Sequence, residues 1–466
     1  TWKAQVEIPD DTPDFKYAYF VKHENGYEKN EWGHGHLFRS GEGVKSYEIF
    51  DRWQDQPWDK PFYSVVFTDC VCRRGGRAMA PKVEAAAMLL SCDAPMVAPD
   101  EVLAVSGGCD AMGNWDPAKA VVMSDAFFPT WSCSLPLDQF PEEVEYKFLI
   151  LKKNSGNVVC WEGCDNRRMI VEPATKGECM TVAGIRFVNP KTPWRGAGVA
   201  IPVFSLRSEE DFGVGEFYDI KMLVDWAAKT GQRFIQMLPI NDTTMTHTWT
   251  DSYPYKANSI FALHPMYLRL KEMGTLSDKE RQAYYDNLAK ELNALEEVDY
   301  ERVNNAKIAY TRELFAEVGE KSCKAPMFRK FVKENASWLI PYAAFCVLRD
   351  RNGSADFSKW GEYAEYDETA VADFVKENQC DINYVCWIQY HLDKQMRAVR
   401  DYAHAHGVAI KGDIPIGISR NSVDAWISPR LFNLDGQAGA PPDDFSVLGQ
   451  NWGLPTYNWE KMAEDG

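Results

Sequence analysis

The spacing of hydrophobic residues changes its period near residue 190. Before that point, short runs such as residues 63–67 and 144–148 alternate apolar and polar side chains and end at Gly, Asn or Asp. A period of two is typical of strands that bury one face, and many such strands separated by turns predict a β-sandwich. We therefore expect residues 1 to about 190 to be all-β.

Two segments of this β region resemble each other in sequence and in spacing, which predicts a repeated module. The first consists of residues 14–20 with Glu31-Trp32-Gly33, and the second of residues 145–150 with Trp161-Glu162-Gly163. The front half of the repeat has no counterpart ahead of the first segment. We accordingly expect residues 1–75 to be the C-terminal part of a first sandwich module and residues 83–190 to be a second module.

After about residue 195, buried apolar runs alternate with amphipathic stretches. Residues 198–204 and 233–240 have the composition of strands, and residues 219–230 between them place apolar side chains at helical spacing. Residues 384–406 and 408–414 repeat this order of helix and strand. Alternation of strands with helices indicates an α/β domain with a parallel sheet.

A charged and mostly helical stretch, about residues 270–380, separates these units. It is too long for an ordinary loop, so we expect a helical insert after the second strand. A (β/α)8 TIM barrel has eight strands in about 250 residues, and about three strands are visible here. The predicted fold class is therefore multi-domain, with all-β sandwich modules followed by residues 195–466 as the first part of an α/β barrel.

Charge and hydropathy narrow the possible partners. The formal net charge of −17 argues against a nucleic-acid partner, because binding a polyphosphate requires a basic surface. No apolar run reaches the about 18 residues of a membrane-spanning helix, and no signal-like segment opens the chain. We expect neither nucleic acid nor a membrane as a partner.

Cysteine usage bears on compartment and on metals. The twelve cysteines are scattered along the chain, which is typical of reduced thiols in the cytoplasm and not of a secreted disulfide framework. No second cysteine pair stands at zinc-ligand spacing, so no metal and no cofactor are expected. Because the chain begins with Thr and stops at Gly466 after an acidic segment, we also expect it to be a fragment of a longer protein.

Aromatic residues point to a possible ligand. The sequence has 16 Trp and 21 Tyr, many of them in polar loops. Sugars present C–H faces that pack on such rings, although core packing is the alternative use of these residues. In a βα barrel, ligands meet the loops at the carboxyl ends of strands. Polar and aromatic motifs follow each predicted strand, at residues 204–215, 239–255 and 411–417, and continue at 439–459.

These motifs resemble those of the amylomaltases, the 4-α-glucanotransferases of glycoside hydrolase family 77. Phe-Ser-Leu-Arg-Ser, Asp-Ser-Tyr-Pro-Tyr, Gly-Asp-Ile-Pro-Ile-Gly, Gly-Ala-Pro-Pro-Asp and Gly-Gln-Asn-Trp-Gly occur in the family's order over about residues 195–466. In the β half, the motifs at residues 113–116, 146–148 and 161–167 are similar to a family 20 carbohydrate-binding module, a starch-binding domain.

The second resemblance implies roles for residues of the β half. Trp115 and Trp161 would form a sugar-stacking platform, and Lys147, Glu162 and Asn166 would bond hydroxyl groups at its edge. The first copy departs from the Trp-Glu order at residues 31–32. Its only matches are Lys16 and Trp32, and sugar binding by this copy is left open.

The barrel resemblance implies a glucan-binding groove. Asp251, Ser252 and Tyr255 would line its donor side, and Asp413 would bond a glucose unit near the cleavage point. Gln450 and Trp452 would contact the acceptor.

The implied mechanism is retaining, with an Asp nucleophile, a Glu acid/base and a further Asp. Family order places these carboxylates after Gly466, so no catalytic residue is expected within this chain. The implied activity (EC 2.4.1.25) moves α-1,4-glucan segments between partners such as maltodextrin, starch, glycogen and maltose. Two alternatives stay open: a non-catalytic starch- or glycogen-binding fragment, and an α-amylase-type hydrolase.

Overall fold

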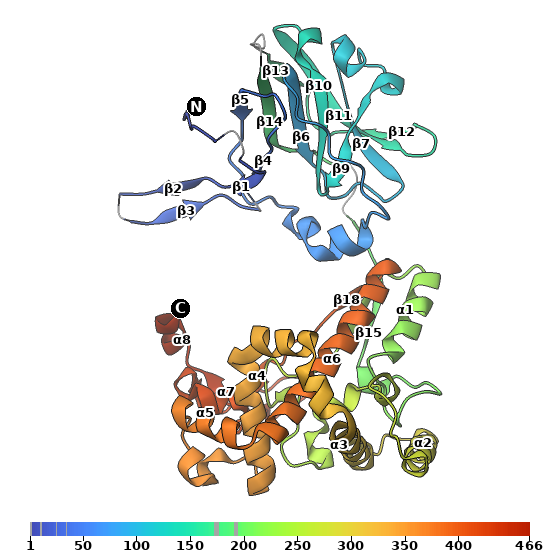
Figure 1. The fold of residues 1–466 in the computed structure, drawn as a ribbon, viewed down its shortest axis with the longest axis vertical. Helices are drawn as coiled ribbons and strands as arrows, with labels where there is room; N and C mark the ends of the chain where they lie inside the picture. Colours follow the sequence, from blue (N-terminus) through green and yellow to red (C-terminus); the bar gives the residue numbers. More distant parts are fainter. Residues whose placement is uncertain (1, 10–11, 25, 34, 172–176, 191–193) are drawn as a thin grey trace. The chain divides into compact units, whose positions relative to one another are not determined.

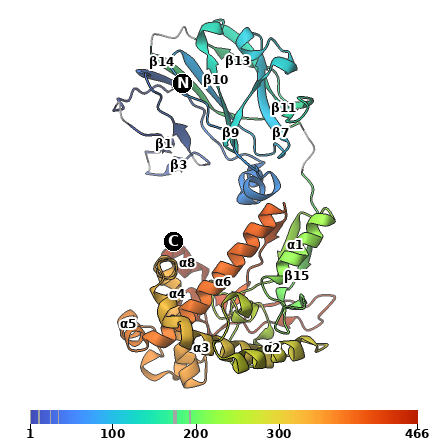
Figure 2. The same cartoon turned by 45° about the vertical axis from the view of Figure 1, so that its right-hand side comes forward.

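The chain folds as two compact units, residues 1–195 and 196–466. The computed structural model describes residues 2–9, 12–24, 26–33, 35–171, 177–190 and 194–466, and the units are drawn in Figures 1 and 2. The division falls where the hydrophobic pattern changes its period. Each unit has its own buried core.

Two sheets enclose the main core of the first unit. One has the order β5 (Ser46–Phe50), β14 (Glu178–Arg186), β6 (Ala87–Asp93), β10 (Thr130–Pro136) and β9 (Ser124–Phe127). The other has the order β12 (Val158–Trp161), β11 (Glu143–Lys152), β7 (Glu101–Gly107) and β8 (Val121–Val122), and β13 (Arg167–Ile170) also pairs with β11. Side chains from both sheets share one core, which includes Met88, Leu103, Trp131 and Phe148. The sandwich prediction for this region is thereby confirmed.

The first repeat is arranged differently from the prediction of a separate sandwich. Among its described residues, β1 (Phe15–Tyr17) pairs with β4 (His36–Phe38), and β2 (Phe20–Lys22) pairs with β3 (Glu28–Asn30). The strand β5 then pairs in parallel with β14 of the sandwich. Residues 46–50 therefore add an edge strand to the sheet of the second repeat, and the two repeats belong to one compact unit.

A parallel three-stranded sheet organises the second unit. Its order is β15 (Gly198–Ile201), β16 (Phe234–Met237) and β18 (Ala409–Lys411). The helix α1 (Asp219–Lys229) connects the first two strands, and α6 (Gln379–Ala405) precedes the third. The predicted parallel α/β arrangement is confirmed, although the strands are shorter than expected. The first strand, β15, ends before Pro202, because proline lacks the backbone N–H needed to continue the hydrogen bonding of the sheet.

The predicted helical insert lies between β16 and α6. It contains α2 (Lys279–Asn293), α3 (Tyr300–Lys324), α4 (Pro326–Asn352) and α5 (Glu368–Glu377). The helices α3 and α4 pack against α6, which is the long orange helix in Figure 1. Phe345 of α4 and Trp387 and Leu392 of α6 are almost fully buried. The insert therefore shares a core with the βα unit.

Short strands and helices shape the segments that follow the sheet. β17 (Lys256–Ala257) pairs in parallel with β19 (Gly417–Ile418), and the helix α7 (Val423–Ile427) follows. Two small ribbons come last, β20 (Phe432–Asn433) with β23 (Thr456–Tyr457) and β21 (Gly439–Ala440) with β22 (Gln450–Asn451), and then α8 (Trp459–Asp465). These pairings bring the loops after β16 and β18 together.

A buried ionic network attaches the insert to the loop before α1. The Glu216 side chain is 1% exposed and accepts a 2.6 Å hydrogen bond from Lys307 Nζ, which lies on α3. Lys307 also donates to the carbonyl oxygens of Met266 and Leu268. Arg269 pairs with both Glu216 and Asp219. Each of these buried charges has a partner of opposite sign, which a charge away from water requires.

Replacing Glu216 with Gln should lower the free energy of unfolding of the second unit by about 3–5 kcal/mol, because it leaves the Lys307 ammonium buried without a carboxylate. Urea unfolding followed by circular dichroism measures this change. Glu320→Gln on α3, the helix of Lys307, is the control, since Glu320 pairs with Lys324 at the surface. Equal free energies of unfolding for Glu216→Gln and the control variant would contradict the stabilising role of the buried pair between Glu216 and Lys307.

Candidate functional site

Two indole rings lie side by side on the outer face of the second sandwich sheet. Trp161 is directly opposite Leu149 across β11 and β12, and the Trp115 N–H donates to the Gly107 carbonyl at the end of β7. Their ring centroids are 6.3 Å apart and the ring planes are inclined by 45°. Both residues are only partly buried. We call this pair, Trp115 and Trp161, the aromatic platform.

The backbone around Trp115 is held in an unusual conformation. Gly113, Asn114 and Trp115 have φ angles of 77°, 49° and 66°. Positive φ costs energy for residues with a Cβ and persists where the surrounding structure imposes it, often at functional sites. The indole packs over Gly108, where a Cβ would lie at ordinary contact distance, 3.4 Å from Trp115 Nε1. The loop thus positions one ring of the platform.

Polar side chains border the platform on the same face of β11. Lys147 and Leu149 are two residues apart, so they point to the same side of the strand. Glu145, two residues further back, accepts hydrogen bonds from Asn166 Nδ2 at 3.2 Å and from Arg168 Nε at 3.0 Å. The structure therefore places Lys147 and Asn166 on the face of the platform, and their contact with a sugar stays a prediction. It adds Glu145, which the alternation of β11 could have revealed.

Glu162 does not lie at this edge. Its side chain is fully buried, and it accepts a bidentate pair of bonds from Arg167, at 3.0 Å to Nε and 2.8 Å to Nη2. The Phe148 N–H also donates to Glu162 at 3.0 Å. Burial opposes the charge on Arg167, but the bonds and the charge of Glu162 outweigh burial and raise the pKa of Arg167. In place of the predicted sugar contact, the structure gives Glu162 the role of joining β11 to β13.

The first repeat reproduces this arrangement in the same register. Tyr17 is opposite His36, just as Tyr146 is opposite Arg167. The Tyr19 N–H donates to Glu31 at 2.8 Å, as the Phe148 N–H does to Glu162. Phe20 is opposite Asn30, as Leu149 is opposite Trp161. The predicted repeat is therefore present in three dimensions.

The shared register revises the predicted site of the first repeat. Ala18 takes the place of Lys147, and Asn30 takes the place of Trp161. Lys16 instead corresponds to Glu145. Trp32 corresponds to Gly163, and its ring packs against Arg186 at 5.3 Å and edge-on against Tyr63. At the position of Trp161 the first repeat thus has Asn30, which offers no ring for stacking. The sequence comparison had matched Lys16 with Lys147 and Trp32 with Trp161, two residues away from the true register in each case.

Tyr255 and Asp413 meet in the second unit. The Tyr255 hydroxyl donates to Asp413 Oδ2 at 2.9 Å, and this bond raises the pKa of Tyr255. Asp413 follows β18, and Tyr255 directly precedes β17, which pairs with β19. The two side chains are distant in sequence, and the structure brings them together at the carboxyl end of the parallel sheet.

Asp251 is buried in the loop before Tyr255. Its Oδ2 atom accepts hydrogen bonds from the backbone N–H groups of Met245, Thr246 and His247 at 2.8–3.0 Å. The carboxylate therefore fixes the shape of this loop. Ser252, the next residue, is exposed.

Gln450 and Trp452 form a second pair on the last loop. Trp452 Nε1 donates to Gln450 Oε1 at 3.0 Å, and both side chains are exposed. The same loop contacts the segment after β18, because the Tyr457 hydroxyl donates to the Ile416 carbonyl at 3.2 Å. Four of the six residues predicted for the barrel site thus form two pairs on neighbouring loops, Tyr255 with Asp413 and Gln450 with Trp452.

A buried network behind these loops was missed in the sequence. Asp242 follows β16, and its Oδ2 atom accepts hydrogen bonds from the Tyr342 hydroxyl at 2.8 Å and from Asn258 Nδ2 at 3.2 Å. Burial and the neighbouring Asp242 raise the pKa of Tyr342 well above its ordinary value. Residues 241–244 belong to the polar segment 239–255 after the predicted strand, but the partner of Asp242 on α4 is distant in sequence, so the pairing could not be predicted. This network links the loop after β16 to the insert.

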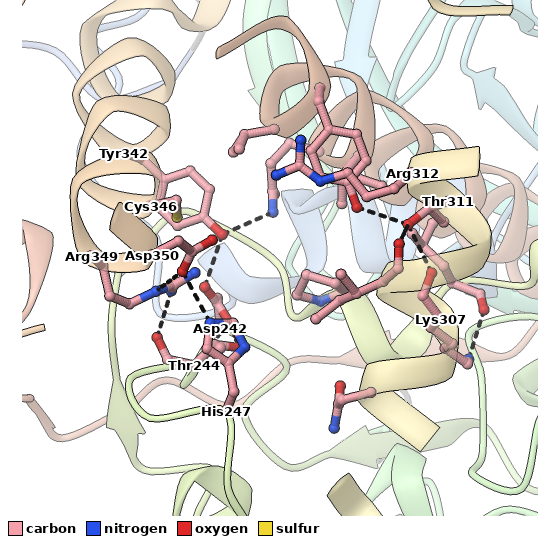
Figure 3. A pocket seen from close by; sticks show the side chains of 18 of the residues that line it. Asp242, Thr244, His247, Lys307, Thr311, Arg312, Tyr342, Cys346, Arg349 and Asp350 are labelled. Atoms are coloured by element: carbon pink, nitrogen blue, oxygen red, sulfur yellow. Dashed lines mark hydrogen bonds and ion pairs between the residues drawn. The ribbon is translucent and has the colours of Figure 1, made fainter. Parts of the chain in front are cut away.

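Figure 3 shows the pocket beside this network. It is a cavity of about 100 Å³ between the loop after β16 and helices α3, α4 and α6. Arg349 and Arg312 on its wall are already paired, with Asp350 and Asp381 at 2.8 and 2.9 Å. Its charges are therefore satisfied within the protein.

The described residues contain no cluster of His, Cys, Asp and Glu arranged to hold a metal ion. Within the same residues, no helix has the length and apolar character needed to cross a bilayer.

Fold alone does not define function, but a sandwich with an aromatic platform, joined in one chain to a parallel βα sheet with polar and aromatic loops, is the arrangement expected of a modular carbohydrate-active protein. Residues 201–466 match the glycoside hydrolase family 77 of 4-alpha-glucanotransferases, and residues 87–180 match the starch binding domain of family 20. The chain belongs to the 4-alpha-glucanotransferase family, and it carries a starch-binding domain ahead of the family region.

Several 4-alpha-glucanotransferases are similar in sequence to this chain. The 4-alpha-glucanotransferase DPE2 of Oryza sativa subsp. japonica is 36% identical over 475 residues, which cover 97% of this chain and 49% of that protein. The 4-alpha-glucanotransferase of Chlamydia muridarum is 34% identical over 272 residues, 58% of this chain and 50% of that one. The chain thus spans about half the length of these relatives.

Among solved structures, the amylomaltase from Streptococcus agalactiae in complex with acarbose superposes with a TM-score of 0.51 at 28% sequence identity. The match covers 58% of this chain and 55% of that one.

Replacing Trp161 or Trp115 with Ala should weaken binding of β-cyclodextrin, a cyclic α-1,4-glucan, by about thirtyfold, which corresponds to the loss of a binding hot spot of about 2 kcal/mol. Isothermal titration calorimetry measures the affinity. Trp58→Ala is the control, because Trp58 is 82% exposed in the same unit but is not part of the platform. Unchanged affinity of both platform variants would refute the assignment.

Replacing Glu162 with Gln should lower the free energy of unfolding by about 3–5 kcal/mol, because it leaves Arg167 half-buried without its carboxylate. Affinity for β-cyclodextrin, measured well below the unfolding midpoint, should change by less than about twofold. Glu143→Gln serves as the control, since Glu143 on the neighbouring strand β11 forms an exposed pair with Arg168. Loss of affinity without loss of stability would show that Glu162 does contact the sugar.

Proposed function

We propose that this chain is the starch-binding and N-terminal catalytic part of an enzyme that transfers α-1,4-glucan segments from one glucan to another. Maltodextrin, starch, glycogen and maltose are the proposed substrates, and the cytoplasm is the proposed compartment. Membership of the 4-alpha-glucanotransferase family supports this reaction class. The reaction needs no cofactor, because both the bond that breaks and the bond that forms are glycosidic.

The second unit is proposed to be the beginning of a (β/α)8 barrel. Its three parallel strands lie in the sheet in their order along the chain, with helices between them. This is how a barrel begins, and its ligands bind at the carboxyl ends of the strands. The loops that follow β16 and β18 are therefore the expected walls of the glucan groove.

The hydrogen bond between Tyr255 and Asp413 is the observation that carries the proposal. It joins two loops at the carboxyl end of the sheet through one phenol and one carboxylate. The phenol ring offers an apolar face to a glucose unit, and the carboxylate accepts hydrogen bonds from hydroxyl groups. Asp413 Oδ1 receives one backbone hydrogen bond, from Ile414, which holds the carboxylate in place without consuming all of its acceptor sites.

Trp452 and Gln450 are proposed to receive the acceptor sugar. The indole supplies a stacking face, and the bond to Gln450 sets the orientation of the ring. Transfer requires that a sugar hydroxyl reach the glycosyl-enzyme intermediate ahead of water. A site that orients the acceptor and excludes solvent favours that outcome. The predicted retaining mechanism supplies the covalent intermediate on which this competition takes place.

The aromatic platform is proposed to hold the polymer near the catalytic unit. Trp115 and Trp161 are tilted relative to each other, which suits a helically curved α-1,4-glucan better than a flat chain. A linked binding module raises the local concentration of substrate at the enzyme.

Incubation of the whole enzyme with maltotriose tests the proposed reaction. Glucan transfer produces a ladder of longer oligosaccharides together with short ones, whereas a hydrolase yields short products alone and a binding protein leaves maltotriose unchanged. In this assay Tyr255→Phe should reduce kcat/KM by about tenfold or more, since the lost hydrogen bond to a charged group contributes about 1.5–3 kcal/mol. Tyr253→Phe is the control, because Tyr253 is an exposed neighbour. A product pattern without longer oligosaccharides would overturn the proposal.

A further inference from the structure

The first repeat contains a buried histidine at the position where the second repeat has an arginine. His36 corresponds to Arg167, as the register of β1 with β4 and of β11 with β13 establishes. Arg167 binds one buried carboxylate, Glu162. His36 lies between two carboxylates, with Nε2 3.1 Å from Glu31 and Nδ1 3.2 Å from Asp51. The side chains of all three are at most 6% exposed.

Every group that faces His36 favours a positive charge on the ring. Glu31 follows β3, and Asp51 follows β5. The hydroxyl groups of Tyr17 and Tyr19 both donate to Asp51 Oδ2, at 2.6 and 2.8 Å, so they stabilise the ionised form of that carboxylate. Among the ion pairs of the described residues, His36 is the cation of both Glu31 and Asp51. A neutral His36 would leave two buried negative charges close together without a cation.

We propose that the fold of the first repeat is held by a proton on His36, and that this repeat therefore opens as the pH rises, whereas the second repeat is held at all ordinary pH values by the permanent charge of Arg167. A guanidinium group does not lose its proton in proteins, while an imidazole does so near neutral pH. The same architectural position thus carries a permanent cation in one copy and a titratable cation in the other.

The direction of the pH effect follows from the surroundings of His36. Burial by itself lowers the pKa of His36, but the bonds and charges of Asp51 and Glu31 outweigh burial and raise it above its ordinary value. A group whose pKa is higher in the folded state stabilises that state fully below its unfolded pKa of about 6.5. That stabilisation is lost as the pH rises from about 6.5 through the folded-state pKa of His36.

The strands that depend on His36 also contact the sandwich. The Asp51 carboxylate directly follows β5, and β5 is paired with β14 at the edge of the sandwich sheet. Opening of the first repeat would release this neighbour of β14 and leave its backbone groups unpaired at a sheet edge. The effect reaches β14, whereas the strands of residues 143–170 belong to the other sheet of the sandwich.

Hydrogen exchange compared between the two repeats tests the proposal within one molecule. Protection factors, which remove the intrinsic pH dependence of exchange, are measured by mass spectrometry for peptides from residues 15–38 and 143–170 between about pH 6 and about pH 9. We expect protection of residues 15–38 to fall by up to about tenfold per pH unit above about pH 6.5. Protection of residues 143–170 should stay constant. Parallel profiles for the two segments would overturn the proposal.

Two variants and one titration complete the experiment. His36→Arg should remove the pH dependence of residues 15–38, because it copies Arg167, whereas His23→Gln, an exposed histidine of the same repeat, should leave it unchanged. If His36→Arg retains the wild-type slope, the proposal is wrong. Should that variant not fold, the pKa of His36 in the wild-type chain, measured by nuclear magnetic resonance, decides the matter: a value above about 6.5 supports the proposal and a value at or below it refutes it.

Discussion

The parallel pairing of β16 with β18 is the constraint on which the second unit depends. These strands are separated in sequence by the whole helical insert, and they are joined in register from Phe234 with Ala409 to Gln236 with Lys411. Because parallel strands share one carboxyl end, the loops that follow them meet on the same side of the sheet. The bond from Tyr255 to Asp413, which joins the loops after these two strands, follows from that pairing.

The helical insert contributes to the groove indirectly. Tyr342 of α4 binds Asp242 in the loop after β16, and Lys307 of α3 binds Glu216 ahead of α1. Both contacts are buried and both cross from the insert to the βα unit. Such bonds fix the position of loops that would otherwise adopt many conformations, since ordering a loop costs conformational entropy that its own short-range contacts do not offset. The insert is therefore part of the framework that positions the site.

The two repeats of the first unit show how one architecture supports different chemistry. In the first repeat, the buried Glu31 accepts a hydrogen bond from the Tyr19 N–H and pairs with His36. In the second, the buried Glu162 accepts one from the Phe148 N–H and pairs with Arg167, again five residues later. The second repeat adds Trp161 and Lys147 on the outer face and so carries the aromatic platform. In the first, Asn30 and Ala18 occupy those positions, and the cation is titratable. The framework was retained while the surface that would contact a sugar changed.

Local hydrophobic spacing was sufficient to predict the sandwich, the parallel βα unit and the helical insert, because each period reflects which face of a strand or helix is buried. Motif order was sufficient to indicate the family, and to place Tyr255 and Asp413 at strand ends. Burial partners were not predictable in the same way. Glu162 was expected at the surface, yet the register of β11 with β13 buries it against Arg167, and Lys16 was matched to the wrong position because sequence spacing does not define a strand register. The sequence by itself determined the elements and their order, whereas pairing between distant strands decided which polar side chains face solvent and which are enclosed.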